Sequence, residues 1–391
     1  MSTIKSVEAI AISIPRETPY LGALETGNKP TPQGYFIRPG NKSVYHVSDQ
    51  SVLVKITVES GEVGWGECVA FYAPEIVVTI LHELVGPLIV GRDVHDVVMI
   101  YEDLYDAMRV RGFFGGFYHD ALAAIDIALW DLKGKLLKTP VYSLLGSGRW
   151  KRIPAYVSGL PKPTIPERVD LAKSWIDRGY DAFKFAAAVS HEGIIAEMDA
   201  LRSGVGKEPR ILIDMHWKFT GAEAVDLITD LDKFDLYVAE APVKPEDMAG
   251  QSYVVRSVKT QVAIGEELRT VYEYRPRFEQ RCMHVIQPEM GRTGITSFWN
   301  ICQMAQAFNC TVMPHASIGV GIFQAASLHA TAALGSHMVY HEYQHSIFDK
   351  NLRFVTGSMS CGEGFFTVPD GPGLGVEPTD ELFRYAKPKR S

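Results

Sequence analysis

Short apolar segments alternate with amphipathic stretches from residue 152 onward, and the pattern recurs every roughly 22–30 residues. This spacing indicates repeated strand–helix units with parallel strands. Eight such units in one domain favour a closed βα barrel over an open doubly wound sheet, and no GxGxxG motif follows the first strand. The expected strands are Ile153–Ser158, Ala182–Ala187, Ile211–His216, Tyr237–Ala241, Val262–Glu266, Val285–Glu289, Val312–His315 and Met338–Tyr343.

The region before this repeat has a different pattern, because segments with alternating apolar residues precede segments with helical periodicity. This order indicates a small antiparallel sheet with helices packed on it. Strands are expected at Val7–Ile14, Ser51–Glu59 and Glu62–Gly66, and helices at Ile76–Val90, Asp96–Met108 and Asp120–Leu136.

The segment Thr18–Gln50, between the first two expected strands, is rich in Gly, Pro, Asn and Tyr and has no clear period. A loop of this length in a compact domain is often a lid or a binding loop. Its Tyr20, Tyr35, Arg38 and His46 could contact a ligand, although for each of these residues alone a solvated insertion is the simpler interpretation.

A chain of 391 residues is expected to divide into about two domains, because a single hydrophobic core rarely extends beyond ~250–300 residues. We expect an α+β capping domain over residues 1–135, with the lid loop at 18–50, and a barrel domain over residues 136–350. A C-terminal segment over residues 351–391 is expected to return to the capping domain.

The charge balance argues against a nucleic-acid partner, since 39 Lys and Arg stand against 46 Asp and Glu and no basic run is present. No stretch reaches roughly 18 consecutive apolar residues, and the first residues lack the apolar core of a signal peptide. The five cysteines form neither a CxxC pair nor a metal-finger spacing, which suits structural thiols in a reducing compartment. We therefore expect a cytoplasmic protein with no nucleic-acid or membrane partner.

Three successive barrel strands are expected to end in acidic residues, namely Asp214, Glu240 and Glu266. Because the C-terminal ends of barrel strands face one mouth, these side chains should converge. A single one could be a helix cap or an ion-pair partner, but three on consecutive strands indicate a set of oxygen ligands. Mg²⁺ prefers such ligands, whereas zinc favours His or Cys. The sequence therefore predicts a Mg²⁺ site at the mouth.

Taken together, these residues resemble the enolase superfamily, mandelate racemase branch, over nearly the whole chain. The resemblance implies an α/β fold in which an N-terminal α+β capping domain is joined to a (β/α)7β modified TIM barrel. It also implies removal of the α-proton of a carboxylate with the help of Mg²⁺. The matching segments are Ala124–Asp131, Asp214 with His216, Glu240-Ala-Pro, Gly265-Glu266, Gln287–Thr296, Pro314-His315, Glu342 and Pro369–Glu377.

The resemblance also implies which groups move protons. His315, at the end of the seventh strand, is similar to the family's base, and Glu289 stands where the family usually has an Asp that fixes the tautomer of the His. Racemases of this branch carry Lys-x-Lys at the second strand. This chain has Lys184-Phe185-Ala186 there, so a second base is missing at that place.

His216 makes the chain most similar to galactonate-type dehydratases, in which the His of an Asp-x-His motif protonates the departing β-hydroxyl. Because side chains alternate along a strand, we expect His216 on the same side as Asp214. A structural or substrate-binding His is the alternative interpretation. By the same resemblance, Lys184, Lys218 and Glu342 are expected to bind the substrate.

The predicted function is the Mg²⁺-dependent dehydration of a sugar acid, an aldonate or an aldarate, to a 2-keto-3-deoxy sugar acid through an enolate. His315 would remove the C2 proton, and His216 would protonate the leaving 3-hydroxyl. An epimerase, racemase or cycloisomerase is one alternative, and a non-catalytic barrel is another. The sequence leaves the identity of the sugar acid open, and the resemblance favours a homo-oligomer.

Overall fold

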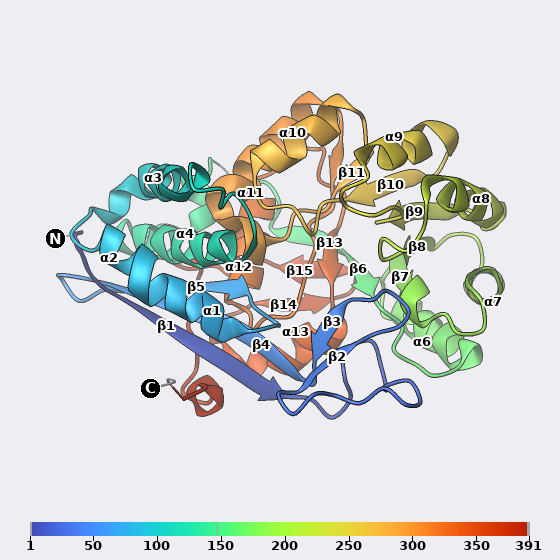
Figure 1. Cartoon of the computed structure of the whole chain (residues 1–391), viewed down its shortest axis with the longest axis horizontal. Coiled ribbons are helices and arrows are strands. Elements are labelled where there is room, and N and C mark those ends of the chain that lie inside the picture. The colour runs from blue at the N-terminus through green and yellow to red at the C-terminus, as the bar shows by residue number, and fades with distance from the viewer. Residues whose placement is uncertain (1, 147, 389–391) are drawn as a thin grey trace.

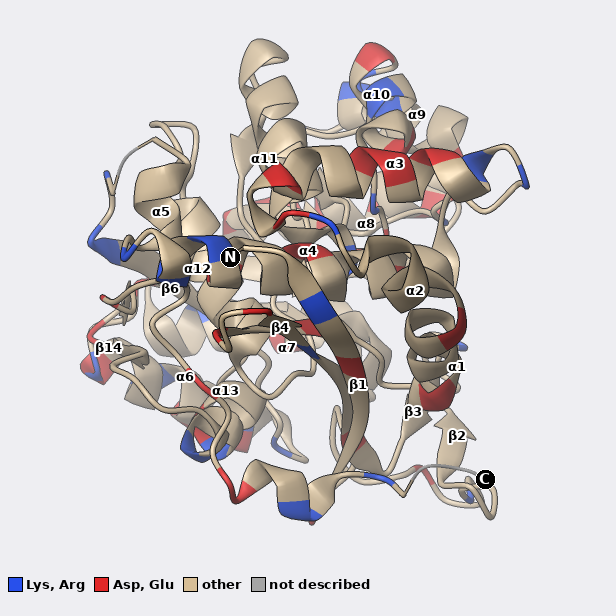
Figure 2. Cartoon of the chain, turned by 90° about the vertical axis from the view of Figure 1, so that its left-hand side faces the viewer, with Lys and Arg blue, Asp and Glu red and all other residues tan. Residues whose placement is uncertain are grey.

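The computed structural model describes residues 2–146 and 148–388. Figure 1 shows two regions side by side, a small sheet covered by helices near the N-terminus and a larger barrel of strands ringed by helices. Within the described residues, no helix combines the length and the apolar character needed to cross a bilayer. On the side seen in Figure 2, α3 carries acidic residues with a basic residue at its C-terminal end, and β1 carries both kinds of charge.

The N-terminal region is built on an antiparallel sheet in the order β1-β4-β5, so the predicted strands are confirmed with slightly shifted ends. The predicted helix over Ile76–Val90 is divided by a wider π turn at Leu81–Val85. The elements are β1 (Ile4–Pro15), β4 (Ser48–Val58), β5 (Val63–Val69), α1 (Pro74–Ile80), α2 (Gly86–Ile89), α3 (Val97–Arg109) and α4 (Gly116–Leu136).

The segment between β1 and β4 is more ordered than the sequence predicts. It contains a hairpin of β2 (Tyr35–Ile37) and β3 (Val44–His46), and β4 already begins at Ser48. Strands of three residues are too short to produce a recognisable apolar alternation. The hairpin turn packs directly on the barrel, because a Cβ on Gly40 would lie 2.1 Å from the carbonyl oxygen of Ala188.

The eight predicted barrel strands are confirmed, and they form a closed ring. Neighbouring strands from β6 to β12 pair in parallel, and β13 pairs with β6. A parallel bridge between Val312 of β12 and Met338, three residues before β13, closes the remaining gap. The strands are β6 (Arg152–Ser158), β7 (Ala182–Ala186), β8 (Arg210–Asp214), β9 (Leu236–Glu240), β10 (Gln261–Ile264), β11 (Val285–Ile286), β12 (Thr311–Val312) and β13 (His341–Tyr343).

Three of the barrel helices begin with the same local signal. Thr164, Thr220 and Thr270 each form a reciprocal capping box with the glutamate three residues later. This arrangement satisfies donors that the start of a helix leaves open. The helices are α5 (Val141–Leu144), α6 (Ile165–Asp177), α7 (Ile194–Val205), α8 (Gly221–Leu231), α9 (Met248–Ser257), α10 (Val271–Glu279), α11 (Met290–Ala307), α12 (Ile322–Ala332) and α13 (His345–Asn351).

The helix α4 lies between the two regions and is buried on nearly all sides, with β5 against one face and α11 against another. Two glycines of β5 allow the close approach. A Cβ on Gly66 would lie 1.9 Å from the carbonyl oxygen of Ala124, and one on Gly64 would lie 2.3 Å from that of Ala128. Small residues such as Ala124 and Ala128 in the matching segment Ala124–Asp131 therefore allow α4 to pack closely against β5.

The side chain of Glu67 on β5 links the capping sheet to the barrel. It is buried and accepts the backbone N–H groups of Val320 (2.5 Å), Ile322 (2.9 Å) and Phe323 (3.1 Å) at the start of α12. The hydroxyl of Ser51 donates to the same carboxylate at 2.6 Å. A negative charge is favourable at a helix N-terminus, so this contact holds the two regions together.

The chain after the barrel contacts both regions. The strands β14 (Ser360–Gly362) and β15 (Phe365–Thr367) form a hairpin, and β15 pairs antiparallel with β6. Farther along, Ala386 bridges Ile12 on β1, and the N–H of Lys387 donates to the carbonyl of Ala11. Figure 1 accordingly shows the end of the chain beside β1.

We predict that Gly66→Ala lowers the free energy of unfolding by about 1–3 kcal/mol, because the new methyl group meets the backbone of α4. Chemical denaturation followed by circular dichroism measures the change. Gly362→Ala is the matched control, since a Cβ there meets nothing within 4 Å, and it should stay within about 0.5 kcal/mol of the natural protein. Equal stability of the two variants would contradict the packing argument.

Candidate active site

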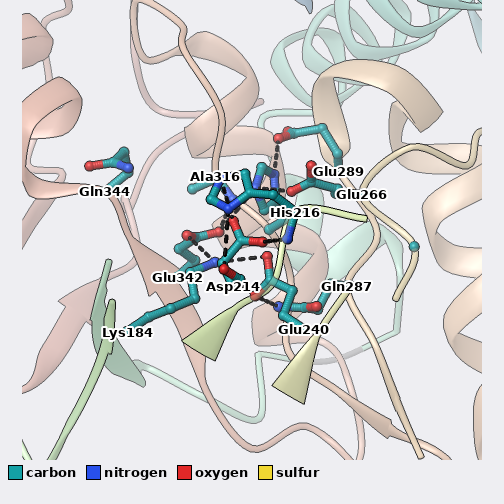
Figure 3. Close-up of polar contacts among 12 residues, drawn as sticks. Lys184, Asp214, His216, Glu240, Glu266, Gln287, Glu289, Ala316, Glu342 and Gln344 are labelled. Carbon is teal, nitrogen blue, oxygen red and sulfur yellow. Dashed lines mark hydrogen bonds and ion pairs between the residues drawn. The ribbon is translucent and has the colours of Figure 1, made fainter. Parts of the chain in front are cut away.

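Charged side chains gather at the C-terminal ends of the barrel strands, as Figure 3 shows. Asp214 ends β8 and Glu240 ends β9, and the two residues are register partners. Glu266 follows β10 after Gly265, whose φ of 129° favours glycine. The hydroxyl of Tyr274 donates to the carbonyl of Gly265 at 2.9 Å and holds this turn.

Lys184 on β7 is the counter-ion for Glu240 and for a further carboxylate at the mouth, that of Glu342 on β13. Its Nζ donates to Oε1 and Oε2 of Glu240 at 2.8 and 2.7 Å and lies 3.0 Å from Oε1 of Glu342. Burial alone would lower the pKa of Lys184, but the charges of Glu240 and Glu342 outweigh it and hold the pKa well above its usual value. The lysine is therefore protonated.

Two further residues contact this ion pair, and neither was predicted to belong to the site. The Nε2 of Gln287 donates to Oε2 of Glu240 at 2.6 Å, and the hydroxyl of Tyr156 lies 3.5 Å from Nζ of Lys184. Gln287 belongs to the matching segment Gln287–Thr296, so the family resemblance already pointed to this residue. Tyr156 lies inside an apolar strand, and no pattern distinguishes it from core residues.

His315 lies between two carboxylates. Its Nδ1 is 2.8 Å from Oε2 of Glu289, and its Nε2 is 2.5 Å from Oε2 of Glu266. The longer Glu289 fits because it also caps α11, where it accepts the N–H of Gly291 at 3.2 Å. Burial would lower the pKa of His315, but the charges of Glu266 and Glu342 outweigh it and raise the pKa well above its usual value.

His216 reaches the site by a different route from the predicted one. β8 ends at Asp214, and His216 and Trp217 have φ values of 52° and 51° in the left-handed region. The alternation argument is therefore wrong, because the backbone has already left the strand. A turn brings the imidazole back, and its Nε2 lies 3.0 Å from Oδ2 of Asp214. Such conformations are costly for residues other than glycine and concentrate at functional sites.

Burial also shifts the pKa values of His216 and Asp214. It lowers the pKa of His216 to about 4, so the ring is neutral at neutral pH. Burial also raises the pKa of Asp214 to about 7, where the charge of Lys184 opposes the shift and that of Glu266 adds to it.

The mouth suits a divalent cation because its carboxylates outnumber its cationic groups. One ligand atom from each of Glu240, Glu266 and His315 lies within 4.8 Å of the others. The predicted Mg²⁺ ligands share Glu240 and Glu266 with this group, whereas Asp214 faces His216. The buried or half-buried acids are Asp214, Glu240, Glu266, Glu289 and Glu342, and the bases that pair with them are Lys184, His216 and His315. Mostly oxygen donors with excess negative charge fit Mg²⁺.

The two remaining predicted substrate-binding residues lie in different places. Glu342 belongs to the cluster, where it also accepts the N–H of Ala316 at 2.9 Å. Lys218 is exposed outside the cluster, with its Nζ 5.8 Å from the ring centre of Phe219. It lines a separate cavity together with His216.

Two tyrosines of the segment before β4 approach the carboxylates from the capping side. The hydroxyl of Tyr20 accepts a hydrogen bond from Nε2 of Gln344 at 2.9 Å, and its ring centre lies 5.9 Å from that of Tyr45. Burial raises the pKa of Tyr20, and the charge of Glu342 adds to the shift. Burial likewise raises the pKa of Tyr45 to about 12, and the charge of Asp214 contributes. Both phenols are therefore close to the acidic cluster.

A buried arginine holds this segment in place. Arg38 is only 1% exposed, and its Nη2 donates to the carbonyls of Tyr20 and Gly22 at 2.6 and 2.5 Å. Its Nη1 donates to the carbonyl of Ala23 and pairs with Glu25, both at 3.2 Å. The interpretation as a solvated insertion is wrong for Arg38, because its guanidinium replaces water as the donor to the loop.

Two family models match the chain. The description "Mandelate racemase / muconate lactonizing enzyme, N-terminal domain" matches residues 30–146, and "Enolase C-terminal domain-like" matches residues 167–382.

Individual relatives differ in their named reactions. A solved structure from Sinorhizobium meliloti, provisionally named as an isomerase, is 49% identical, has a TM-score of 0.97, and covers 98% of this chain and 99% of its own. The arabinonate dehydratase of Saccharolobus solfataricus is 27% identical over 86% of this chain and 91% of its own. The D-galactarolactone cycloisomerase of Agrobacterium fabrum is 30% identical over 83% of this chain and 88% of its own.

We predict that Arg38→Met loosens residues 16–47, because five hydrogen bonds to four loop residues, two of them to the carbonyl of Tyr20, lose their donor. Chymotrypsin cleavage at the tyrosines of this segment should become faster by about ten-fold or more, since about 1.4 kcal/mol of lost local stability has this effect. Mass spectrometry of timed digests measures the rate. The exposed Arg111 provides the control, and Arg111→Met should be cleaved like the natural protein. Equal cleavage rates for the two variants would refute the role of Arg38.

Proposed function

Because the chain belongs to the mandelate racemase and muconate lactonizing enzyme family of the enolase superfamily, we propose that it is a Mg²⁺-dependent dehydratase of a sugar acid. One observation carries the proposal: two separate imidazoles meet a single carboxylate cluster, His315 against Glu266 and His216 against Asp214. Dehydration needs a base at one carbon and an acid at the next. Ala186, which has no proton to give, stands where racemases carry a second Lys.

In the proposed reaction, the Nε2 of His315 takes the proton from C2, and the electron pair left behind forms the enolate. The C3–O bond then breaks, and His216, which must first take up a proton because burial keeps its ring neutral, gives that proton to the departing hydroxyl, so that water leaves. The resulting enol tautomerises to a 2-keto-3-deoxy sugar acid. Glu289 supports this role of His315, because its contact with Nδ1 orients the ring and leaves Nε2 toward the mouth.

Glu240, Glu266 and Asp214 would hold the Mg²⁺, which when bound supplies positive charge to stabilise the enolate. With Glu266 engaged as a metal ligand, its charge would no longer support the protonated form of His315 to the same degree, and His315 would be better able to act as a base. Lys184 and Glu342 are already paired with each other beside the cluster, where an ammonium group can bind a substrate oxygen.

A second candidate is isomerisation, either epimerisation or cycloisomerisation. The 49% identical structure named provisionally as an isomerase and the 30% identical cycloisomerase favour it. The neutral state of His216 is compatible with a residue that only binds substrate. In this case protonation would return to carbon and no keto acid would form.

We predict that His315→Asn abolishes both solvent deuterium exchange at C2 and keto-acid formation with an aldonate or aldarate. His216→Asn should keep the exchange and slow keto-acid formation by about 10²–10⁴-fold, because only the general acid is lost. Proton NMR in D₂O measures exchange, and a keto-acid assay measures product. Equal losses of exchange in both variants would exclude the assigned roles, and exchange without keto acid in the natural protein would support isomerisation.

We predict that Glu266→Gln weakens Mg²⁺ binding by about ten-fold or more, because a charged ligand becomes neutral. Isothermal titration calorimetry with MgCl₂ measures the affinity without any turnover. The exposed Glu363 serves for comparison, and Glu363→Gln should bind Mg²⁺ like the natural protein. Unchanged affinity in Glu266→Gln would place the ion elsewhere.

A further inference from the structure

A cavity of about 840 Å³ opens beside His216 and is separate from the carboxylate cluster. We call it the His216 cavity. Residues after β8, residues after β9 and the turn of the β2–β3 hairpin enclose it, so both the barrel and the capping region contribute. Its lining residues are Pro39–Ser43, His216–Thr220, Val243–Pro245 and Asp247.

The lining carries an excess of positive charge. Lys42, Lys218 and Lys244 all face this cavity, and none of them forms an ion pair with any residue that the structure describes. The one acid, Asp247, is occupied at the start of α9, where it accepts the N–H of Gly250 at 2.8 Å. All three lysines are exposed, so an anion that enters the cavity meets three positively charged groups along its lining.

A fourth donor also lacks a protein acceptor. The indole Nε1 of Trp217 is buried, and no described residue accepts its hydrogen. Burying a donor without a partner is costly, so such groups usually have a ligand or water. The left-handed conformation of His216 and Trp217 places both side chains at this cavity, since both belong to its lining.

The cavity adjoins the proposed reaction site, because two of its lining residues contact residues at that site. His216 lines the cavity and lies 3.0 Å from Asp214 in the cluster. On the capping side, Asn41 lines the cavity and donates to the hydroxyl of Tyr45 at 2.8 Å, and the charges of Asp214 and Glu266 act on that hydroxyl. His216 and the Asn41–Tyr45 contact therefore lie between the carboxylate cluster and the lysines of the cavity.

Another large cavity, of about 730 Å³, lies at the opposite ends of the strands and differs in chemistry. Its Arg202 is already satisfied, because it donates to the carbonyls of Phe234, Pro209 and Asp235 at 2.8, 2.8 and 3.1 Å. Its four basic residues are offset by three acids, Glu208, Asp232 and Asp235. By contrast, the three lysines of the His216 cavity have no ion-pair partner among the described residues, and this cavity lies next to the proposed reaction site.

From these contacts we infer that the His216 cavity binds an anionic group at the far end of the substrate. The inference rests on the proposed function and makes it more specific. The substrate class is a sugar acid with a second terminal anion, either the carboxylate of an aldarate or the phosphate of a phosphorylated aldonate. Lys218, Lys244 and Lys42 select for this group, with the indole of Trp217 as a further donor.

The test compares hexarates, hexonates and 6-phosphohexonates as substrates in the presence of Mg²⁺. The natural protein should show a kcat/KM for one of the two anionic classes at least about ten-fold above that for hexonates. Lys218→Met should lower kcat/KM for the preferred class by about 10- to 100-fold, mainly through KM, because a hydrogen bond to a charged group is lost. The loss with hexonates should be smaller, and Lys218→Arg should restore most of the activity.

Lys259→Met is the matched control, since Lys259 lines the cavity at the other end of the strands and should not affect any of the three classes. Comparison of kcat/KM for hexarates and for 6-phosphohexonates shows whether the cavity binds a carboxylate or a phosphate. A natural protein that prefers hexonates, or a Lys218→Met variant that loses the same factor with all three classes, would overturn the inference.

A binding measurement separates this inference from the proposed function. Calorimetry of a hexarate, a hexonate and a 6-phosphohexonate with His315→Asn needs no turnover. Tighter binding of an anionic class, lost when Lys218→Met is added, supports the subsite even if the natural protein forms no keto acid. Keto-acid formation without this preference would support the dehydratase and reject the subsite.

Discussion

Unbalanced negative charge, buried at the mouth of the barrel, is the constraint on which the rest of the site depends. Carboxylates from five strand ends converge there, and within residues 2–146 and 148–388 Lys184 is the one lysine or arginine that pairs with them. In a buried setting like charges repel strongly, so the arrangement persists only with cations or protons. This explains why His315 is protonated between Glu266 and Glu289, and why the mouth is suited to a divalent ion.

The frame that holds these charges together is a set of close contacts between the capping region and the barrel. Gly66 allows α4 to approach the capping sheet, and Glu67, one residue later, caps a barrel helix. With the two regions fixed, Arg38 can hold the segment before β4 against the mouth. The His216 cavity exists for the same reason, since the hairpin turn provides one of its walls. Packing far from the chemistry therefore determines which ligand can reach it.

Much of the fold and of the site could be predicted from the sequence, because the strands repeat regularly and each local pattern spans only a few residues. The eight barrel strands, the acids at their ends and the family resemblance required only neighbouring residues. The prediction for His216 reached the right neighbourhood by a wrong argument, since a left-handed turn and not strand alternation brings its ring to Asp214. The site roles of Gln287 and Tyr156 were missed, because their partners Glu240 and Lys184 lie on other strands.

The sequence by itself determined the order and type of the elements and the residue types at the strand ends, since periodicity and turn residues act over a few positions. Only the tertiary structure decided which of those groups touch. The burial of Arg38, the pairing of Lys184 with Glu240 and Glu342, and the wall that residues 39–43 build around His216 join segments far apart along the chain. Such contacts depend on how two regions pack against each other, and no local pattern carries that information.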